Sequence, residues 1–310
     1  MNIQTGLITS AFGRHYQLET DNHQRLLAHP RGKKSEAVVG DRVQWQHSQD
    51  EAVIEKILPR RNLFYRQDEI RTKAFAANLD QILIMIAAEP EFSESQLSRA
   101  LIAAAAEEIN AIIILNKADL ATPFQKALER LHPYIQMGYQ IKQISLKNNP
   151  AENTTTPDLA HNTPATQQIL PLLHGKTTLV LGPSGAGKST LINTLIPDAQ
   201  AQTNELSKAL KTGKHTTTTS QWYWLPNHKG AIIDSPGFQE FGLNHIPPEN
   251  LAQLMPDIRQ YSTQCRFYNC THLHEPGCGV IQAVESGYIP QTRYRIYCDI
   301  MQDALNASKY

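Results

Sequence analysis

One eight-residue segment of the sequence contains the residue types that bind a polyphosphate. It reads Gly182-Pro183-Ser184-Gly185-Ala186-Gly187-Lys188-Ser189, with Thr190 next, and it matches the phosphate-binding P-loop in full. Its glycines let the backbone curl until N–H groups face phosphate oxygens, and a following helix adds positive potential. In that arrangement Lys188 bridges the β- and γ-phosphates, and the Ser189 hydroxyl binds Mg²⁺. The segment predicts a nucleoside triphosphate site, and the alternative is a chance match in a loop.

A second segment, Asn116-Lys117-Ala118-Asp119, predicts which base is bound. It follows an apolar run, residues 111–115, that reads as a buried strand, and open α/β sheets bind ligands at the carboxyl ends of their strands. A carboxylate at that place accepts two N–H donors at once. Guanine offers N1–H and N2–H₂ on one edge, whereas adenine offers no such pair. Asp119 is therefore the predicted specificity residue, and Asn116 and Lys117 are expected to shape the pocket around guanine.

Two further segments contain groups suited to magnesium and to the terminal phosphate. Asp234-Ser235-Pro236-Gly237 ends a predicted strand, so that Asp234 suits a position behind the Mg²⁺ ligands and the Gly237 N–H can contact the γ-phosphate. Residues 213–219 include four consecutive threonines, of which Thr217 is predicted to complete the Mg²⁺ shell and to sense the γ-phosphate. An ordinary β-turn and the start of a strand are the alternatives for these two segments.

Three of the four cysteines lie close together with a histidine, in the order Cys265, Cys270, His272 and Cys278. In a reducing compartment this spacing favours a metal site over disulfides. Three thiolates and one imidazole match the four ligands of tetrahedral Zn²⁺, and four protein ligands leave no position for a substrate, so the zinc is predicted to be structural. His274 is a neighbouring competitor for the histidine position, and Cys298 is expected to be a buried thiol in a helix.

Residues 1 to about 66 carry short alternating runs separated by Gly, Asn, Pro and charged residues. The runs read as five strands, at residues 6–10, 16–19, 25–28, 42–45 and 53–57. Five short strands at this spacing predict a small all-β barrel of the oligonucleotide-binding (OB) type. Basic residues occupy its loops and its exit: Arg31, Lys33, Lys34, Arg60, Arg61 and Arg66. A solvated surface and a polyanion-binding surface both remain open interpretations.

From about residue 78 the pattern changes to strands that alternate with helices. Apolar runs predict strands at residues 81–87, 111–115, 139–144, 177–181, 221–225 and 231–234. Helices are predicted at residues 93–108, 122–136 and 189–195. This alternation predicts a mainly parallel, doubly wound sheet, which would present the P-loop and the base motif at strand ends. The expected domains are residues 1–66, 67–242 and 243–310, the last one small, helical and zinc-binding.

Composition limits the class of protein. The chain has 310 residues, of which 41% are hydrophobic and 19% charged, which excludes a disordered chain and a coiled coil. No apolar run approaches the roughly 18 residues of a membrane span, and the N-terminus lacks a secretion-signal pattern, so a cytoplasmic protein without a membrane partner is expected. Basic and acidic residues balance at 29 each, and any nucleic-acid role therefore depends on local patches.

The order of the nucleotide motifs is unusual, because the base motif precedes the P-loop, whereas Ras-like GTPases carry it last. The parts fit one sheet if the chain is circularly permuted. With this order the chain resembles the circularly permuted, ribosome small-subunit-dependent GTPases, the RsgA family, also called YjeQ or EngC. The resemblance covers nearly the whole chain, and the motifs that carry it include residues 57–62, residues 77–81, the permuted nucleotide motifs and the cysteine motif.

The resemblance implies a function. Members of the family hydrolyse GTP to GDP and phosphate when bound to the small (30S) ribosomal subunit, and they act late in its maturation. It also implies contact with 16S rRNA through an RNA-binding barrel, magnesium with GTP, a monomer, and one zinc ion held with His272. In the family a Ser-Ala loop supports the base. Here it reads Ser145-Leu146, and residues 71–75 also depart from the familiar pattern.

Hydrolysis needs an oriented water molecule. Ras-like enzymes use a glutamine directly after the Asp-x-x-Gly motif, where this chain has Phe238, with Gln239 one place further on. His215 lies beside the threonine run and is our hypothesis for the residue that positions water, once a partner orders its loop, with Lys188 and Thr217 as the other catalytic groups. A loop histidine without a role is the alternative.

Two other classes of function stay open on the sequence alone. One is a P-loop ATPase or small-molecule kinase, in which residues 116–119 match by coincidence. The other is an RNA-binding ribosome-assembly scaffold, built from the barrel and the cysteine module, with weak or vestigial nucleotide hydrolysis. Intact Lys188, Ser189 and Asp234 argue against the scaffold.

Overall fold

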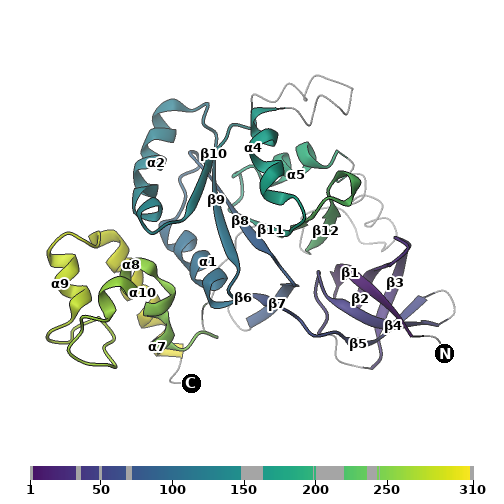
Figure 1. Cartoon of the computed structure of the whole chain (residues 1–310), viewed down its shortest axis with the longest axis horizontal. Helices are drawn as coiled ribbons and strands as arrows, with labels where there is room; N and C mark the ends of the chain where they lie inside the picture. Colours follow the sequence, from purple (N-terminus) through teal and green to yellow (C-terminus); the bar gives the residue numbers. More distant parts are fainter. Residues whose placement is uncertain are drawn as a thin grey trace.

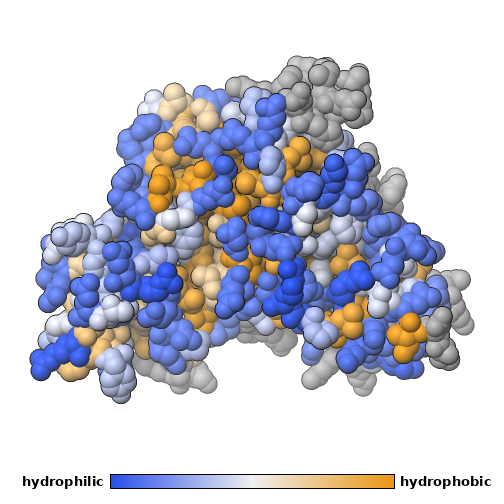
Figure 2. Space-filling model, in the orientation of Figure 1, coloured by the Kyte–Doolittle hydropathy of each residue, from blue (hydrophilic) through white to orange (hydrophobic). Residues whose placement is uncertain are grey.

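The computed structural model shows an α/β domain between a β-barrel and a helical module (Figure 1). The residues that the structure describes are 3–32, 36–48, 51–67, 72–147, 163–197, 199, 220–235, 243 and 245–307. The barrel and the helical module lie on opposite sides of the central domain. In the space-filling view, apolar residues gather mainly over the central domain, while hydrophilic residues predominate over the barrel (Figure 2).

Five strands close into the N-terminal barrel, as predicted. They are β1 (Gln4–Phe12), β2 (His15–Thr20), β3 (Arg25–Pro30), β4 (Arg42–Ser48) and β5 (Glu51–Ile57). The order β1-β2-β3-β5-β4 closes because β4 also pairs with β1, with Gly6 opposite Val43. Alternate side chains fill the interior, among them Ile8, Tyr16 and Trp45, each at most 1% exposed. The period of two in the sequence therefore reflects one face that packs inward.

The central sheet has the strand order β10-β9-β8-β11-β13-β12. Its strands are β8 (Gln81–Ala87), β9 (Asn110–Asn116), β10 (Gln140–Gln143), β11 (Thr177–Leu181), β12 (Gln221–Trp224) and β13 (Ala231–Asp234). All pairings are parallel except that of β12 with β13. Every residue of β8 is buried, as expected for a strand covered on both faces.

Helices cover both faces of this sheet. On one face, α1 (Glu94–Ala106) and α2 (Ala121–Gln136) pack in one apolar cluster with residues of β8 and β9. On the other, α4 (Pro164–Leu173) and α5 (Lys188–Leu195) pack in a second cluster. The α1 helix begins where the sequence predicted, because the Ser93 side chain accepts a hydrogen bond from the Gln96 N–H.

The barrel and the central sheet form one continuous eleven-stranded sheet, because β1 pairs with β12. Ser10 lies opposite Gln221, and its hydroxyl donates to the Gln221 side-chain oxygen. Close by, the Trp224 indole N–H donates to the buried Glu19 carboxylate at 2.7 Å. The barrel is therefore fixed to the strand hairpin that leads to Asp234.

A second small sheet was not expected from the sequence. It is the hairpin of β6 (Leu63–Gln67) and β7 (Thr72–Ala77), whose buried Phe64 packs against the central domain's core. The Leu63 N–H also donates to Glu107, at the end of α1, at 3.3 Å. The predicted boundary between residues 66 and 67 lies within β6.

The C-terminal module is helical, as predicted, with α7 (Pro248–Leu251), α8 (Pro256–Ser262), α9 (Gly279–Glu285) and α10 (Gln291–Ala307). Its apolar side chains are continuous with the cluster that includes α1 and α2. No helix in the described part of the chain has the length and apolar character that crossing a bilayer requires.

Candidate functional site: a nucleotide pocket and a cysteine cluster

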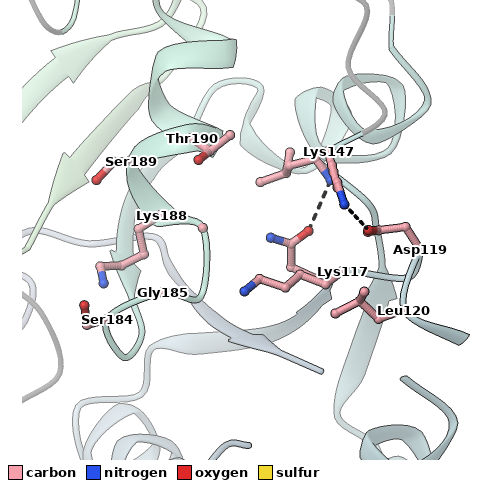
Figure 3. A pocket seen from close by; sticks show the side chains of 12 residues that line it. Lys117, Asp119, Leu120, Lys147, Ser184, Gly185, Lys188, Ser189 and Thr190 are labelled. Carbon is pink, nitrogen blue, oxygen red and sulfur yellow. Dashed lines mark hydrogen bonds and ion pairs between the residues drawn. The ribbon is translucent and has the colours of Figure 1, made fainter. Parts of the chain in front are cut away.

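A pocket of about 600 Å³ opens between the P-loop and the loops after β9 and β10. Asp119 and Lys188 both line it, although 69 positions separate them in the chain. The strands that end at these two segments, β9 and β11, flank β8 in the sheet. Figure 3 shows Ser184, Lys188 and Ser189 on one side and Asp119 and Lys147 on the other, with the Lys117 side chain between them. The sheet thus brings the two motifs to one pocket.

Asn116 connects the two sides of this pocket. It is 3% exposed, and its side-chain amide donates to the Ala186 carbonyl at 2.9 Å. Its side-chain oxygen accepts the Leu146 N–H at 3.2 Å. The replacement of the familiar alanine by leucine at position 146 therefore leaves this backbone contact in place.

The base side of the pocket holds the Asp119 carboxylate in a defined position. The Ser145 hydroxyl donates to its Oδ1 at 2.7 Å, and the Lys147 Nζ lies 3.9 Å from its Oδ2. Lys117 adopts a positive φ of 68°, and its Nζ donates to the Glu89 carbonyl. The aliphatic part of the Lys117 side chain therefore lies along this side of the pocket. A carboxylate oriented by a neighbouring hydroxyl is suited to accept two donors from a planar ligand.

The P-loop backbone turns at glycines, in conformations and contacts that other residues would not tolerate. Gly187 has φ +102°, and a Cβ there would lie 2.4 Å from the Asn116 side-chain nitrogen. Gly182 has φ +154°, and its Cβ would lie 2.1 Å from the Met85 carbonyl oxygen. The Lys188 ammonium folds back and donates to the carbonyls of Gly182 and Pro183 at 2.6 and 3.2 Å. It is held at the mouth of the loop, where a phosphate would lie.

Lys188 and Asp234 perturb each other electrostatically. Burial lowers the pKa of the Lys188 ammonium, and the nearby Asp234 carboxylate opposes that change. Burial raises the pKa of Asp234 to about 6, against the opposing effect of Lys188. Ionisable groups whose pKa values are shifted by burial and by a specific charged neighbour concentrate at functional sites.

The structure describes most, but not all, of the predicted nucleotide residues. Twelve described residues line the pocket, among them the predicted Asn116, Lys117, Asp119, Ser184, Gly185, Gly187, Lys188, Ser189 and Thr190. Ser145, Gly182, Pro183 and Ala186 contact these residues from behind. His215, Thr217 and Gly237 lie outside the described residues, as do Phe238 and Gln239. Leu120 and Lys147 also line the pocket and were not predicted, although each lies within two positions of a predicted residue.

The cysteine motif folds into one cluster of side chains. The ligand atoms of Cys265, Cys270, His272 and Cys278 all lie within 4.8 Å of one another. His272 is buried and directs its Nδ1 at the sulfurs of Cys265 and Cys278, at 3.3 and 3.5 Å. Neither His274, which is exposed, nor Cys298 belongs to the cluster. Cys298 lies on α10 as predicted, but it is half-buried rather than buried. The four side chains can hold a metal ion.

Hydrogen bonds from neighbouring groups fix the loop that carries His272. The Glu275 carboxylate accepts bonds from the Thr271 N–H and hydroxyl and from the N–H groups of Leu273 and His274. Burial raises the pKa of Glu275, but these bonds outweigh it and hold the pKa at about 2. On the opposite side, the Tyr294 hydroxyl donates to the His272 carbonyl at 2.8 Å. The backbone that carries His272 is therefore held both by its own loop and by α10.

The fold and the pocket define a class of protein. A P-loop and a guanine-type motif share one pocket, and the guanine-type motif, after β9, precedes the P-loop, after β11, in the chain. This arrangement is that of a circularly permuted P-loop GTPase. Comparison with known proteins then gives the family.

The RsgA GTPase family model matches residues 57–244. Two relatives are named small ribosomal subunit biogenesis GTPase RsgA. The one from Variovorax paradoxus is 58% identical over 99% of this chain and 94% of its own length. The one from Burkholderia pseudomallei strain K96243 is 48% identical over 96% of this chain and 92% of its own length. YjeQ from Thermotoga maritima superposes with a TM-score of 0.71 at 27% identity, covering 98% of this chain and 99% of that one. YloQ, a circularly permuted GTPase, gives 0.68 at 27% identity, over 98% and 96%. The chain belongs to the RsgA GTPase family.

Proposed function

We propose that this protein is a GTPase that binds the small ribosomal subunit and acts in its late maturation, hydrolysing GTP to GDP and phosphate with stimulation by the subunit. The observation that carries the proposal is the single pocket of about 600 Å³ lined by both Asp119 and Lys188. The relatives' names, which refer to small ribosomal subunit biogenesis, support the choice of partner.

Each residue of the pocket has a proposed role. Asp119 accepts the N1–H and N2–H₂ groups of guanine, Ser145 orients its carboxylate, and Asn116 and Lys117 shape the base side. The N–H groups of the P-loop cradle the phosphates, with Lys188 across the β- and γ-phosphates. The residues proposed to bind the phosphates are Gly182, Pro183, Ser184, Gly185, Ala186, Gly187, Lys188, Ser189 and Thr190, with Gly237 at the γ-phosphate.

Magnesium is proposed to accompany GTP, with Ser189 and Thr217 as its protein ligands and Asp234 behind them. The fit rests on Asp234, because burial raises its pKa to about 6 and a nearby divalent cation would stabilise its ionised form. When bound, the ion neutralises the charge that develops on the phosphates. His215 is proposed to orient the attacking water, and Lys188 to stabilise the charge on the γ-phosphate.

The metal of the cysteine cluster is proposed to be one structural zinc ion. The sulfurs of Cys265 and Cys278 are 3.8 Å apart. Two ligands at the usual Zn–S distance of about 2.3 Å, placed at tetrahedral corners, are separated by about 3.8 Å. Three sulfurs and one imidazole nitrogen also match the ligand preference of zinc rather than that of calcium or magnesium.

The remaining assignments follow from the family and the architecture. We propose three domains, residues 1–66, 67–242 and 243–310, in a monomeric cytoplasmic protein that contacts 16S rRNA through its barrel. Only some of the basic side chains of the barrel are free to contact RNA, because others pair with carboxylates of the barrel. Arg60 is engaged by the fully buried Asp41 at 2.7 Å, and Arg31 by Glu55 at 2.7 Å. Arg60 therefore supports the barrel itself rather than forming a free basic surface.

The test is GTP hydrolysis by the purified protein with and without small ribosomal subunits. We expect strong stimulation by the subunit, its loss in Lys188→Ala, and labelled GTP that is displaced by GDP but not by ATP. His215→Ala should keep GTP binding and lose most of the stimulated turnover. Displacement by ATP would indicate a kinase or ATPase, and binding to the subunit without any turnover would indicate a scaffold.

A further inference from the structure

A second cavity, of about 460 Å³, lies between the barrel and the central domain. Arg42 and Arg61 line it from the barrel side, and Lys176, Trp222 and Trp224 line it from the side of the central sheet. It shares no lining residue with the nucleotide pocket. Its volume falls in the range of small-molecule sites and suffices for one nucleotide. We call it the interdomain cleft.

The wall of the interdomain cleft carries positive charge. The described residues that line it include Arg42, Arg61 and Lys176, and none of them is an aspartate or a glutamate. Asp21 pairs with Arg42 at 3.0 Å and Asp80 with Arg61 at 2.7 Å, and both arginine side chains are about half or more exposed, at 48% and 60%. Exposed pairs of this kind contribute little, so a phosphate competes well for the arginines. The Lys176 ammonium donates to the neutral side-chain oxygen of Gln81 at 3.0 Å, which leaves its charge uncompensated by that contact.

The same wall carries aromatic rings in fixed positions. The rings of Trp222 and Trp224 lie 5.1 Å apart at 72°, and the His228 ring lies 5.0 Å from that of Trp224. The Glu19 carboxylate, 4% exposed, anchors the Trp224 indole N–H at 2.7 Å. Within the described part of the chain, the buried Trp222 indole N–H has no hydrogen-bond partner. Preordered rings beside cations are the combination that binds unstacked nucleotides.

We infer that the interdomain cleft binds a single unstacked nucleotide, with its base against Trp224 and His228 and its phosphate at Arg42 and Lys176. The nucleotide is either free or an unpaired residue of an RNA strand, since both present the same base and phosphate. Because the described lining of the two cavities has no residue in common, binding in the cleft can be measured separately from GTP hydrolysis. A failure of this inference therefore leaves the proposed function untouched.

Tryptophan fluorescence of the full chain reports on this site directly. Of the three tryptophans, two line the cleft, and the third, Trp45, is fully buried inside the barrel. With one equivalent of Mg-GDP present, UMP and octauridylate are titrated separately. Equal quenching at equal nucleotide concentration identifies a free nucleotide, and much tighter quenching by octauridylate identifies an RNA strand. No quenching by either probe overturns the inference.

Variants separate the cleft from general RNA affinity, with labelled octauridylate followed by anisotropy. Trp224→Leu should weaken binding by about 5- to 150-fold through lost stacking, while Trp224→Phe keeps an aromatic ring and most of the affinity. Lys176→Gln should lower the slope of log K against log salt by about 0.7, the value for one phosphate contact on a single strand.

The matched control is Arg31→Gln, which removes a barrel cation that pairs with Glu55 outside the cleft wall. It should leave the affinity and the salt slope unchanged. Basal GTP hydrolysis should be the same in all of these variants. Unchanged affinity in both Trp224→Leu and Lys176→Gln, or an equal loss in Arg31→Gln, overturns the inference.

Discussion

Asn116 and Ala186 are joined by a hydrogen bond of 2.9 Å between the side-chain amide of the first and the backbone carbonyl of the second. Asn116 also accepts the Leu146 N–H, so one buried side chain ties the P-loop to the loop after β10. The distance between the phosphate side and the base side of the pocket is therefore set by a residue of the base motif. Gly187 permits this arrangement, because any larger side chain would meet Asn116.

Gly187→Ala should disable nucleotide binding. The new Cβ would lie 2.4 Å from the Asn116 side-chain nitrogen, and the backbone at φ +102° disfavours any L-residue. We expect GDP affinity to fall by at least about tenfold, which corresponds to roughly 1.4 kcal/mol, measured by calorimetric titration.

Gly175→Ala is the matched control for this change. Gly175 also has a positive φ, of +72°, but a Cβ there meets no atom within 4 Å. This variant should lose only about 1 kcal/mol of stability for its backbone conformation and keep full GDP affinity. Equal GDP affinity in both variants would contradict the role given to the contact between Gly187 and Asn116.

Asp119→Asn should change the preferred base from guanine to xanthine. The carboxylate offers only acceptors, whereas an amide offers an NH₂ donor group and one acceptor oxygen. Xanthine carries a C2 carbonyl where guanine carries an amino group. Loss of charge-assisted bonds, at about 1.5–3 kcal/mol each, predicts a fall in GDP affinity of about tenfold or more and a gain for XDP. Competition of labelled GDP by XDP measures the switch.

Ser145→Ala provides a graded comparison with Asp119→Asn. It removes the hydroxyl that donates to Asp119 Oδ1 at 2.7 Å but keeps the carboxylate. GDP affinity should fall by a smaller factor, about threefold to tenfold, with no gain for XDP. A preference for XDP in this variant, or none in Asp119→Asn, would show that Asp119 does not read the base.

Periodicity in the sequence predicted most of the fold. Strand β11 has the predicted limits of residues 177–181, and α2 starts one residue before its predicted position. The P-loop and the base motif could also be placed, because each follows a buried strand and the carboxyl ends of parallel strands meet at one edge. Local pattern and strand order together were therefore sufficient to bring Asp119 and Lys188 to one edge of the sheet.

Features that depend on contacts between distant segments could not be predicted. The pairing of β1 with β12 joins segments more than 200 positions apart. From its residue type Glu19 would be expected at the surface, but in the structure it is buried and bonded to Trp224. The β6–β7 hairpin lies in a segment of mixed composition whose apolar residues pack on the central domain. Ser145 was suggested only by family resemblance, because a lone serine in a loop carries no periodic signal.

Glu275→Gln should weaken metal retention without removing a ligand. The ionised Glu275 carboxylate accepts four bonds from Thr271, Leu273 and His274, and these bonds hold the loop that carries His272. A neutral amide accepts fewer and weaker bonds, because it has only one acceptor oxygen. We expect faster release of the bound metal ion to a chromogenic chelator, by about tenfold, the usual effect of losing a group that supports a ligand.

Glu285→Gln serves as the control, since Glu285 is an exposed residue at the end of α9. Its rate of metal release should match that of the unmodified chain. GDP affinity should be unchanged in both variants, because the cysteine cluster and the nucleotide pocket share no residue. Equal release rates in Glu275→Gln and Glu285→Gln would show that the loop is held by other contacts.

Arg293→Met should loosen the C-terminal module from the central domain. Arg293 is 2% exposed. Its guanidinium donates to Asp257 of α8 at 2.8 Å and to Tyr134 of α2 at 3.1 Å, with a further bond to Ser98 of α1. Removing it leaves the Asp257 carboxylate without its cation, a change that costs about 3–5 kcal/mol when an ion pair is buried. Urea unfolding measures this loss.

Arg99→Met is the control, because its partner Asp303 is 58% exposed, and it should cost at most about 1 kcal/mol. A similar cost for the two variants would mean that apolar packing alone holds the module in place.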